Sequence, residues 1–282
     1  MVKIISDSTC DLSKDLLEKY DVAILPLHIL LGTKEYLDGV NITQREIYEW
    51  ADANKTTPKT SAPSLDAAMD LLKPYVQAGE EVVCFSISDD MSASGNVMRL
   101  AAKELHAEDK IKVVNSANLS TGIGLLVIEA AIMAGEGKSA GEIVEKMEEL
   151  KPQVRSSFVV DTLVYLHRGG RCSGLAAMAG SALKLHPKIV VENGKMKPSK
   201  KYRGQINKVV MSYVTDMEED LKRGKKERVF ITHSECRKEL VDEVQAYLES
   251  LNHFDEILVT FTGSVVSSHC GPGTLGVLYI EA

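Results

Sequence analysis

Long apolar segments, closely spaced cysteines and aromatic residues are all scarce in this chain of 282 residues. The longest nearly apolar run, Gly122–Gly135, contains Glu129 and is too short to cross a bilayer. The five cysteines are widely separated and include no CxxC pair, which argues against a disulfide framework or a zinc site. The first residues contain no apolar stretch typical of a secretory signal. These absences predict a cytoplasmic protein with no stable membrane insertion.

Charge and motifs exclude further classes of protein. The net charge is −7, and an acidic chain is not built mainly to coat nucleic acid. Aromatic residues make up 5% of the chain against 44% for all apolar residues, so the apolar content is mainly aliphatic. Gly271–Gly276 matches the GxGxxG pattern, but only six residues follow it and they have strand character, so we expect no dinucleotide site. With no HExxH, GxSxG or EF-hand pattern either, we expect no metal and no cofactor.

Short β-branched segments alternate with segments in which apolar residues recur every three or four positions. This alternation predicts an α/β fold of two α/β domains with mainly parallel sheets. We place the domains at 1–155 and 156–282, and a ligand most often lies in the cleft between two such halves. The strands expected in the first domain are Val2–Ser6, Val22–Leu27, Glu81–Ser86 and Ile111–Val114.

In the second half, Asn193-Gly194 is a strong turn signal and predicts a hairpin between Ile189–Val191 and Lys195–Lys197. The other elements expected there are helices at Leu175–Leu185, Gln205–Leu221 and Arg237–Leu251 and strands at Val229–Thr232, Ile257–Phe261 and Val277–Ile280.

Two hydroxyl-rich segments, Lys59–Ser64 and Met91–Asn96, each precede a predicted helix. Backbone N–H groups at a helix N-terminus are unpaired and attract anions, and nearby hydroxyls add hydrogen-bond donors. Thr60, Ser61 and Ser94 are therefore candidate anion ligands. The alternative is that these segments only cap their helices, as serine commonly does.

His269 lies among small residues in a Gly/Pro-rich segment, where it can donate a hydrogen bond to an anion or carry a charge near neutral pH. The alternative is an incidental surface or core histidine. Arg171 and Arg203 adjoin glycines, and a planar guanidinium is suited to a phosphate or to a partner's carboxylates. The basic stretch Lys184–Arg203 holds seven Lys or Arg against one acid, but such runs are usually solvated. Taken alone, these residues predict a site for a small anion, with aliphatic residues available for an apolar tail.

Five short motifs occur in order along almost the whole chain and resemble those of the DegV family. They are Asp7-Ser8-Thr9-Cys10-Asp11-Leu12, similar to DSxxDL; Thr60–Ser64, similar to TSxPS; Ser94-Gly95, where the family has LSGT; Leu166–Arg171, similar to LxxGGR; and His269–Gly273, similar to HxGPG. Each motif is weak alone, but the ordered set is specific.

The resemblance implies a two-domain α/β protein that holds one long-chain fatty acid between its domains. It also implies that the chain is the lipid-binding subunit of a bacterial fatty acid kinase of phospholipid metabolism, without turnover of its own. A separate ATP-binding subunit would then phosphorylate the acyl carboxylate. Carried onto this sequence, the carboxylate would be held by Thr60, Ser61, Ser94 and His269, and the kinase would dock on a face that includes Arg171 and Arg203.

A hydrolase or acyltransferase acting on a small acyl or phosphate ester is an alternative function, with Ser94 or Ser61 as nucleophile and His269 as base. Such an enzyme also needs an oxyanion hole and a third group that orients the histidine, and no motif supplies them. A second alternative is a regulator that binds nucleic acid through Lys184–Arg203. That binding would weaken steeply as salt is added.

Overall fold

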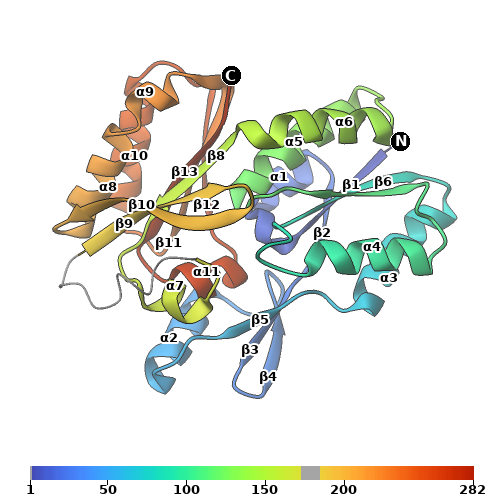
Figure 1. Ribbon diagram of the computed structural model, residues 1–282, viewed down its shortest axis with the longest axis horizontal. Helices are drawn as coiled ribbons and strands as arrows, with labels where there is room; N and C mark the ends of the chain where they lie inside the picture. Colours follow the sequence, from blue (N-terminus) through green and yellow to red (C-terminus); the bar gives the residue numbers. More distant parts are fainter. Residues whose placement is uncertain (1, 173–184) are drawn as a thin grey trace.

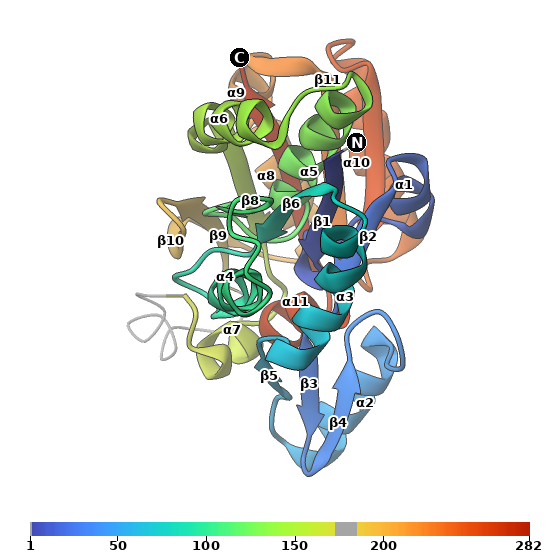
Figure 2. The ribbon, with the colours of Figure 1, turned by 90° about the vertical axis from the view of Figure 1, so that its right-hand side faces the viewer.

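The computed structural model describes residues 2–172 and 185–282, and in these residues the chain forms three sheets. Sheets A and C lie on either side of helix α5 (Thr121–Gly135), and the small sheet B extends below them (Figures 1 and 2). The predicted alternation of strands and helices is present in both halves.

Sheet A is the parallel sheet that we expected in the first half, with strand order β2-β1-β6-β7. Its two central strands are largely buried on both faces, which accounts for their almost continuous apolar sequence. Helices α3 and α4 cover one face and α5 and α6 cover the other. The elements are β1 (Val2–Asp7), η1 (Ser8–Cys10), α1 (Lys14–Lys19), β2 (Val22–Leu25), α3 (Leu65–Gln77), β6 (Glu81–Ser86), α4 (Ser94–Glu104), β7 (Ile111–Asn115) and α6 (Ala140–Leu150).

Sheet B, an antiparallel sheet of order β4-β3-β5, is missing from the sequence prediction. Its strands have four residues or fewer and two of them are mostly polar, so no alternating apolar pattern marks them. Thr60 and Ser61 consequently lie on a strand and not, as expected, at a helix N-terminus. The elements are β3 (His28–Leu31), β4 (Lys34–Leu37), α2 (Gln44–Asn54) and β5 (Lys59–Ser61).

Sheet C has six strands in the order β10-β9-β8-β13-β11-β12, and only β11 and β12 pair in parallel. The expectation of mainly parallel sheets is therefore wrong for this half. The cause is the connections: β9 and β10 form the predicted Asn193-Gly194 hairpin, and the last strand inserts antiparallel between β8 and β11. The elements are η2 (Lys151–Gln153), β8 (Val154–Val159), α7 (Val164–Gly169), β9 (Leu185–Glu192), β10 (Lys195–Arg203), α8 (Ile206–Thr215), α9 (Glu218–Leu221), β11 (Gly224–Ser234), α10 (Lys238–Ser250), β12 (Glu256–Phe261), α11 (Ser264–Cys270) and β13 (Thr274–Glu281).

Two helix predictions in this half differ from the structure. The segment expected as one helix at Gln205–Leu221 is divided into α8 and α9. Residues 175–184 of the other expected helix lie outside the described residues, and Leu185 begins β9. Among the helices of the described residues, none is long and apolar enough to cross a membrane.

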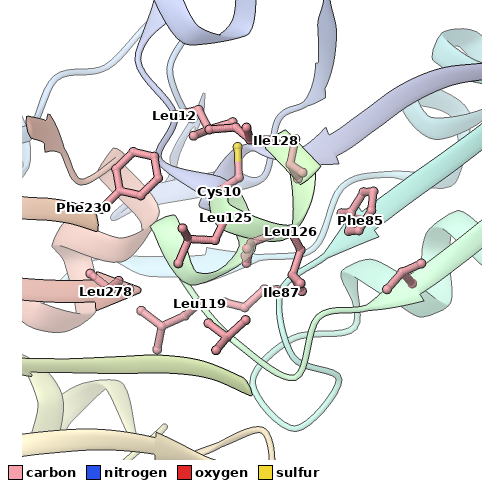
Figure 3. Close-up of a cluster of buried hydrophobic side chains, with 14 of the residues drawn as sticks. Cys10, Leu12, Phe85, Ile87, Leu119, Leu125, Leu126, Ile128, Phe230 and Leu278 are labelled. Atoms are coloured by element: carbon pink, nitrogen blue, oxygen red, sulfur yellow. The ribbon is translucent and has the colours of Figure 1, made fainter. Parts of the chain in front are cut away.

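Helix α5 joins sheets A and C into one core. Ten of its fifteen residues are buried, on more than one side of the helix, and its sequence is almost wholly apolar, as expected for a helix packed on two sides. In Figure 3, Leu125 and Leu126 of α5 lie between Phe230 of β11 and Phe85 of β6. The apolar run at Gly122–Gly135 is therefore an internal helix shared by both halves.

The short helix α11 is attached to the first half of the chain through buried carboxylates. Asp11 Oδ1 accepts a hydrogen bond from the Gly263 N–H at 2.7 Å. Asp38 Oδ1 accepts from the Ser264 and Val265 N–H groups at 2.7 and 3.3 Å. Negative charge is favourable at a helix N-terminus, where backbone N–H groups lack partners within the helix. The position of α11 is therefore set by residues more than two hundred positions away in the sequence.

Replacing Asp38 by asparagine tests what this attachment costs. Burial raises the pKa of Asp38 to about 6. The folded wild type therefore releases this proton at a higher pH than the unfolded chain does. The part of the free energy of unfolding that the bound proton contributes is lost as the pH rises through the pKa of the folded state. From pH 4 to pH 7, its free energy of unfolding should fall by about 2 kcal/mol relative to that of Asp38→Asn, which keeps an oxygen acceptor but cannot ionise. Urea unfolding of both proteins across this range measures the difference.

Asp38→Ala is the control, because it removes the acceptor as well as the charge. It should be less stable than the wild type at every pH. If the free energies of unfolding of the wild type and Asp38→Asn changed with pH in the same way, the raised pKa of Asp38 would be contradicted.

Candidate ligand-binding site

A cavity of about 220 Å³ lies where sheet A, sheet B and α11 meet. Three of its lining residues, Leu27, Ile87 and Leu119, follow strands of sheet A, at the edge where open parallel sheets bind ligands. Most of the lining is apolar, and hydroxyl and imidazole groups lie among it. The residues are Leu27, Thr60, Ser61, Ala62, Ile87, Met91, Ser92, Ala93, Leu119, Arg171, Met196, Val265, Val266, His269 and Cys270.

Thr60 and His269 form the polar centre of this lining. The Thr60 hydroxyl and Nε2 of His269 are 2.8 Å apart, within hydrogen-bond distance. On the other side of the ring, a side chain on Gly169 would collide with His269 Nδ1, so only glycine lets the imidazole occupy this position. Ser61, next to Thr60 on β5, lines the same cavity. The structure thus brings together three of the four residues predicted for the anion site.

His269 lies on α11 and not in a loop, and its Nδ1 is buried without a hydrogen-bond partner among the described residues. Burial, together with the smaller effect of the positive charge of Arg171, lowers the pKa of His269 to about 4. The imidazole is therefore neutral at pH 7. Of the two roles that the sequence left open, hydrogen bonding fits the structure and a charge near neutral pH does not.

Ser94 occupies a different position from the other candidates. It is the first residue of α4 and is fully buried, and its hydroxyl lies near the Asp7 carboxyl group, where it lowers the pKa that burial raises. It is absent from the cavity lining, whereas Ser92 and Ala93 of the same loop belong to it. Ser92 Oγ accepts a hydrogen bond from the Ser94 N–H at 3.2 Å. Ser92 is thus a lining hydroxyl that the sequence analysis missed, although it lies in the segment singled out there.

The two candidate docking arginines are far apart. Arg171 lines the cavity and is exposed at its edge, with Nη1 donating to the Gly169 carbonyl at 2.8 Å. Arg203 is exposed at the end of β10, seven residues beyond Met196, the lining residue of that strand. At a strand rise of 3.3 Å per residue, Met196 and Arg203 are roughly 20 Å apart along β10. Arg171 therefore belongs to the cavity edge and Arg203 to a separate part of the surface.

The N-terminal motif supports the site without lining it. Asp7 Oδ2 accepts a hydrogen bond from the Ile87 N–H at 2.9 Å, which holds the loop after β6, and Asp11 holds α11. Burial raises the pKa of both carboxyl groups. The two aspartates position cavity-lining elements, a role that spacing in the sequence does not reveal.

No cluster of three or more metal-ligating side chains is found in the part of the chain that the structure describes.

Comparison with known proteins identifies the family. A family model described as that of an uncharacterised protein of the DegV family matches residues 1–282. The chain belongs to the DegV family. A DegV domain-containing protein of Clostridium acetobutylicum is 32% identical over 280 residues, covering 99% of this chain and 98% of that protein. A DegV domain-containing protein of Deinococcus radiodurans is 32% identical over 283 residues, covering 98% of this chain and 97% of the relative.

Solved DegV structures share the whole fold. A DegV family protein from Thermus thermophilus, described by its fatty acid binding, has a TM-score of 0.91 and 29% identity and covers 100% of this chain and 99% of its own. A stearic acid-binding protein from Eubacterium ventriosum has a TM-score of 0.85 and 33% identity, with 100% and 98% coverage. These matches confirm the predicted DegV membership and the two-domain α/β class.

The alternative of a Ser/His hydrolase finds little support in the geometry. A nucleophile–base pair needs a hydrogen bond between the two side chains and a third group that orients the histidine. His269 Nε2 pairs with Thr60 and not with either candidate serine, and no group among the described residues bonds its Nδ1. The observed arrangement is better suited to hydrogen bonding a ligand.

The low pKa of His269 can be tested by NMR titration. We expect no protonation of its imidazole down to about pH 5, because burial and the charge of Arg171 disfavour the imidazolium. Arg171→Met should raise this pKa, since it removes the charge and keeps an apolar stem. Arg168→Met, at an exposed position on α7, should leave it unchanged. A wild-type His269 that titrates near 6.5, the ordinary value for histidine, would contradict this description.

Proposed function

We propose that this protein binds one long-chain fatty acid, with the carboxylate at the Thr60–His269 pair and the acyl chain in the apolar part of the cavity. The observation that carries this proposal is the hydrogen-bonded pair set into an otherwise mainly apolar cavity. The descriptions of the Thermus thermophilus and Eubacterium ventriosum proteins as fatty acid-binding support it. Ser61 lines the same cavity from β5 and would be a further ligand of the carboxylate, whereas Ser94 would reach it only after local rearrangement.

The energetics agree with an amphipathic ligand. Each buried CH₂ contributes roughly 0.8 kcal/mol, so an acyl chain supplies most of the binding free energy. Burying the carboxylate is costly unless it is hydrogen-bonded, and hydroxyl and imidazole donors offset that cost. A cavity of 150 Å³ holds benzene, so about 220 Å³ takes roughly nine carbons. A longer chain must widen the cavity, and two of its lining residues, Met91 and Met196, have adaptable side chains.

We propose further that the protein presents the carboxylate to a separate ATP-binding kinase subunit in the cytoplasm. A carboxylate oxygen would attack the γ-phosphorus of ATP held by that subunit. The new O–P bond forms as the bond to ADP breaks, and ADP leaves. This chain would contribute orientation of the carboxylate and no turnover of its own. The support is the family resemblance together with the exposed arginine at the cavity edge, with Arg203 as a second docking residue.

Thr60→Val tests the carboxylate site. The substitution keeps the side-chain volume and removes the hydroxyl, so the affinity for palmitate should fall roughly tenfold, as for other hydrogen bonds to charged groups. Thr56→Val, at an exposed position before β5, is the matched control and should bind as the wild type does. Displacement of a fluorescent fatty acid gives the affinities, and native mass spectrometry gives the stoichiometry. Wild-type protein that neither carries nor takes up a fatty acid would overturn the proposal.

Arg203→Ala tests the kinase interaction. It should keep its palmitate affinity within about twofold and lower acyl phosphate formation by the kinase subunit roughly tenfold, since arginines often dominate interfaces. Lys201→Ala, exposed on the same strand, is the control and should change neither. If Arg203→Ala empties the protein of lipid, the separation of docking residue and cavity is wrong.

A further inference from the structure

A second cavity, of about 290 Å³, adjoins the fatty acid cavity at its edge. We call it the vestibule. The two cavities share Arg171 and Met196. The vestibule has the more polar lining of the two: Asp90, Gly169, Gly170, Arg171, Lys195 and Met196.

The two cations of the vestibule both come from the second half of the chain, and each has a polar neighbour. Arg171 donates to the Gly169 carbonyl, and Gly169 is also the residue against which His269 packs. Lys195 follows the hairpin turn, and its Nζ lies 3.4 Å from Asp90 Oδ1. The hairpin is fixed against the first domain because the Ser88 hydroxyl donates to the Gly194 carbonyl at 2.7 Å. A side chain on Gly194 would collide with Ser88, so this close approach requires glycine.

We infer that the vestibule is the binding site for the phosphoryl group of an acyl phosphate, with Arg171 and Lys195 as its cationic ligands. This inference rests on the proposed function. The phosphoryl group is bonded directly to a carboxylate oxygen, so it must occupy space next to the carboxylate. The acyl cavity is mainly apolar and cannot solvate a dianion, whereas the vestibule adjoins it and presents two cations. A guanidinium fork and an ammonium are the usual protein partners of phosphate.

Asp90 also lines the vestibule, and its negative charge should oppose phosphate binding. Its carboxylate lies beside Lys195 and faces the same space, so it neutralises part of the positive charge and repels an incoming dianion. Removing that carboxylate should therefore strengthen binding of a phosphate headgroup. A fatty acid carboxylate lies inside the first cavity, which neither Asp90 nor Lys195 lines, and its affinity should not change.

The experiment compares palmitate with hexadecyl phosphate, an alkyl phosphate with a dianionic head. Lys195→Met should weaken hexadecyl phosphate roughly fivefold, and Asp90→Asn should strengthen it by a similar factor, as expected for partly exposed charges. Both variants should bind palmitate within about twofold of the wild type. Lys197→Met is the matched control: it lies two residues further along β10, pairs with Glu192 and does not line the vestibule.

The outcomes separate the two levels of the proposal. Unchanged hexadecyl phosphate affinity in both variants, with palmitate bound normally by the wild type, would overturn the vestibule and leave fatty acid binding intact. Equal losses in Lys195→Met and Lys197→Met would also overturn it, because they would reflect general charge and not a site. A wild type that binds neither lipid would instead overturn the proposed function.

Discussion

The site depends on the capping of α11 by carboxylates that come from the first forty residues of the chain. This helix has only seven residues, and its N-cap, Gly263, has no side chain with which to cap it. Asp11 and Asp38 accept hydrogen bonds from its first N–H groups, and without them these buried groups would lack partners. Burial raises the pKa of both carboxyl groups, so each ionised aspartate costs stability in return for holding the helix. Because α11 carries His269, this attachment is what makes the two halves of the chain into one site.

The polar end of the cavity is neutral, and this suits both an empty and a filled state. An unpaired cation at the position of His269 would be expensive to bury whenever the ligand is absent. A neutral imidazole paired with a hydroxyl avoids that cost and still offers hydrogen bonds to a carboxylate. A carboxylate held by hydrogen bonds and not by a buried ion pair would also keep more of its negative charge, which the proposed phosphorylation requires. The nearest formal charge, on Arg171, is placed at the exposed edge.

The sequence predicted those parts of the structure that follow from local patterns. Sheet A follows from strands buried on both faces, and the hairpin follows from Asn193-Gly194. Sheet B could not be predicted, because its strands have only three or four residues each, too few for an alternating pattern, and its core forms only where α2 and α11 cover it. Outside the β9–β10 hairpin, the pairing directions in sheet C could not be predicted either, since they depend on where the last strand inserts. Thr60, Ser61 and His269 were found as residue types, but the close approach of Thr60 to His269 depends on the attachment of α11.

Arg171 lines both adjoining cavities, so its charge acts on groups in each of them. Its charge lowers the pKa of His269, which means that it disfavours a proton on the imidazole. An anion beside Arg171 would offset that charge, so the proton affinity of His269 should rise when the vestibule fills. A carboxylate in the first cavity acts on the imidazole in the same direction. A bound anion therefore raises the pKa of His269 above its value in the empty site. If the vestibule holds the phosphoryl group as we infer, Arg171 would contact that group and also act on His269, so phosphorylation of the ligand would raise the pKa of the imidazole.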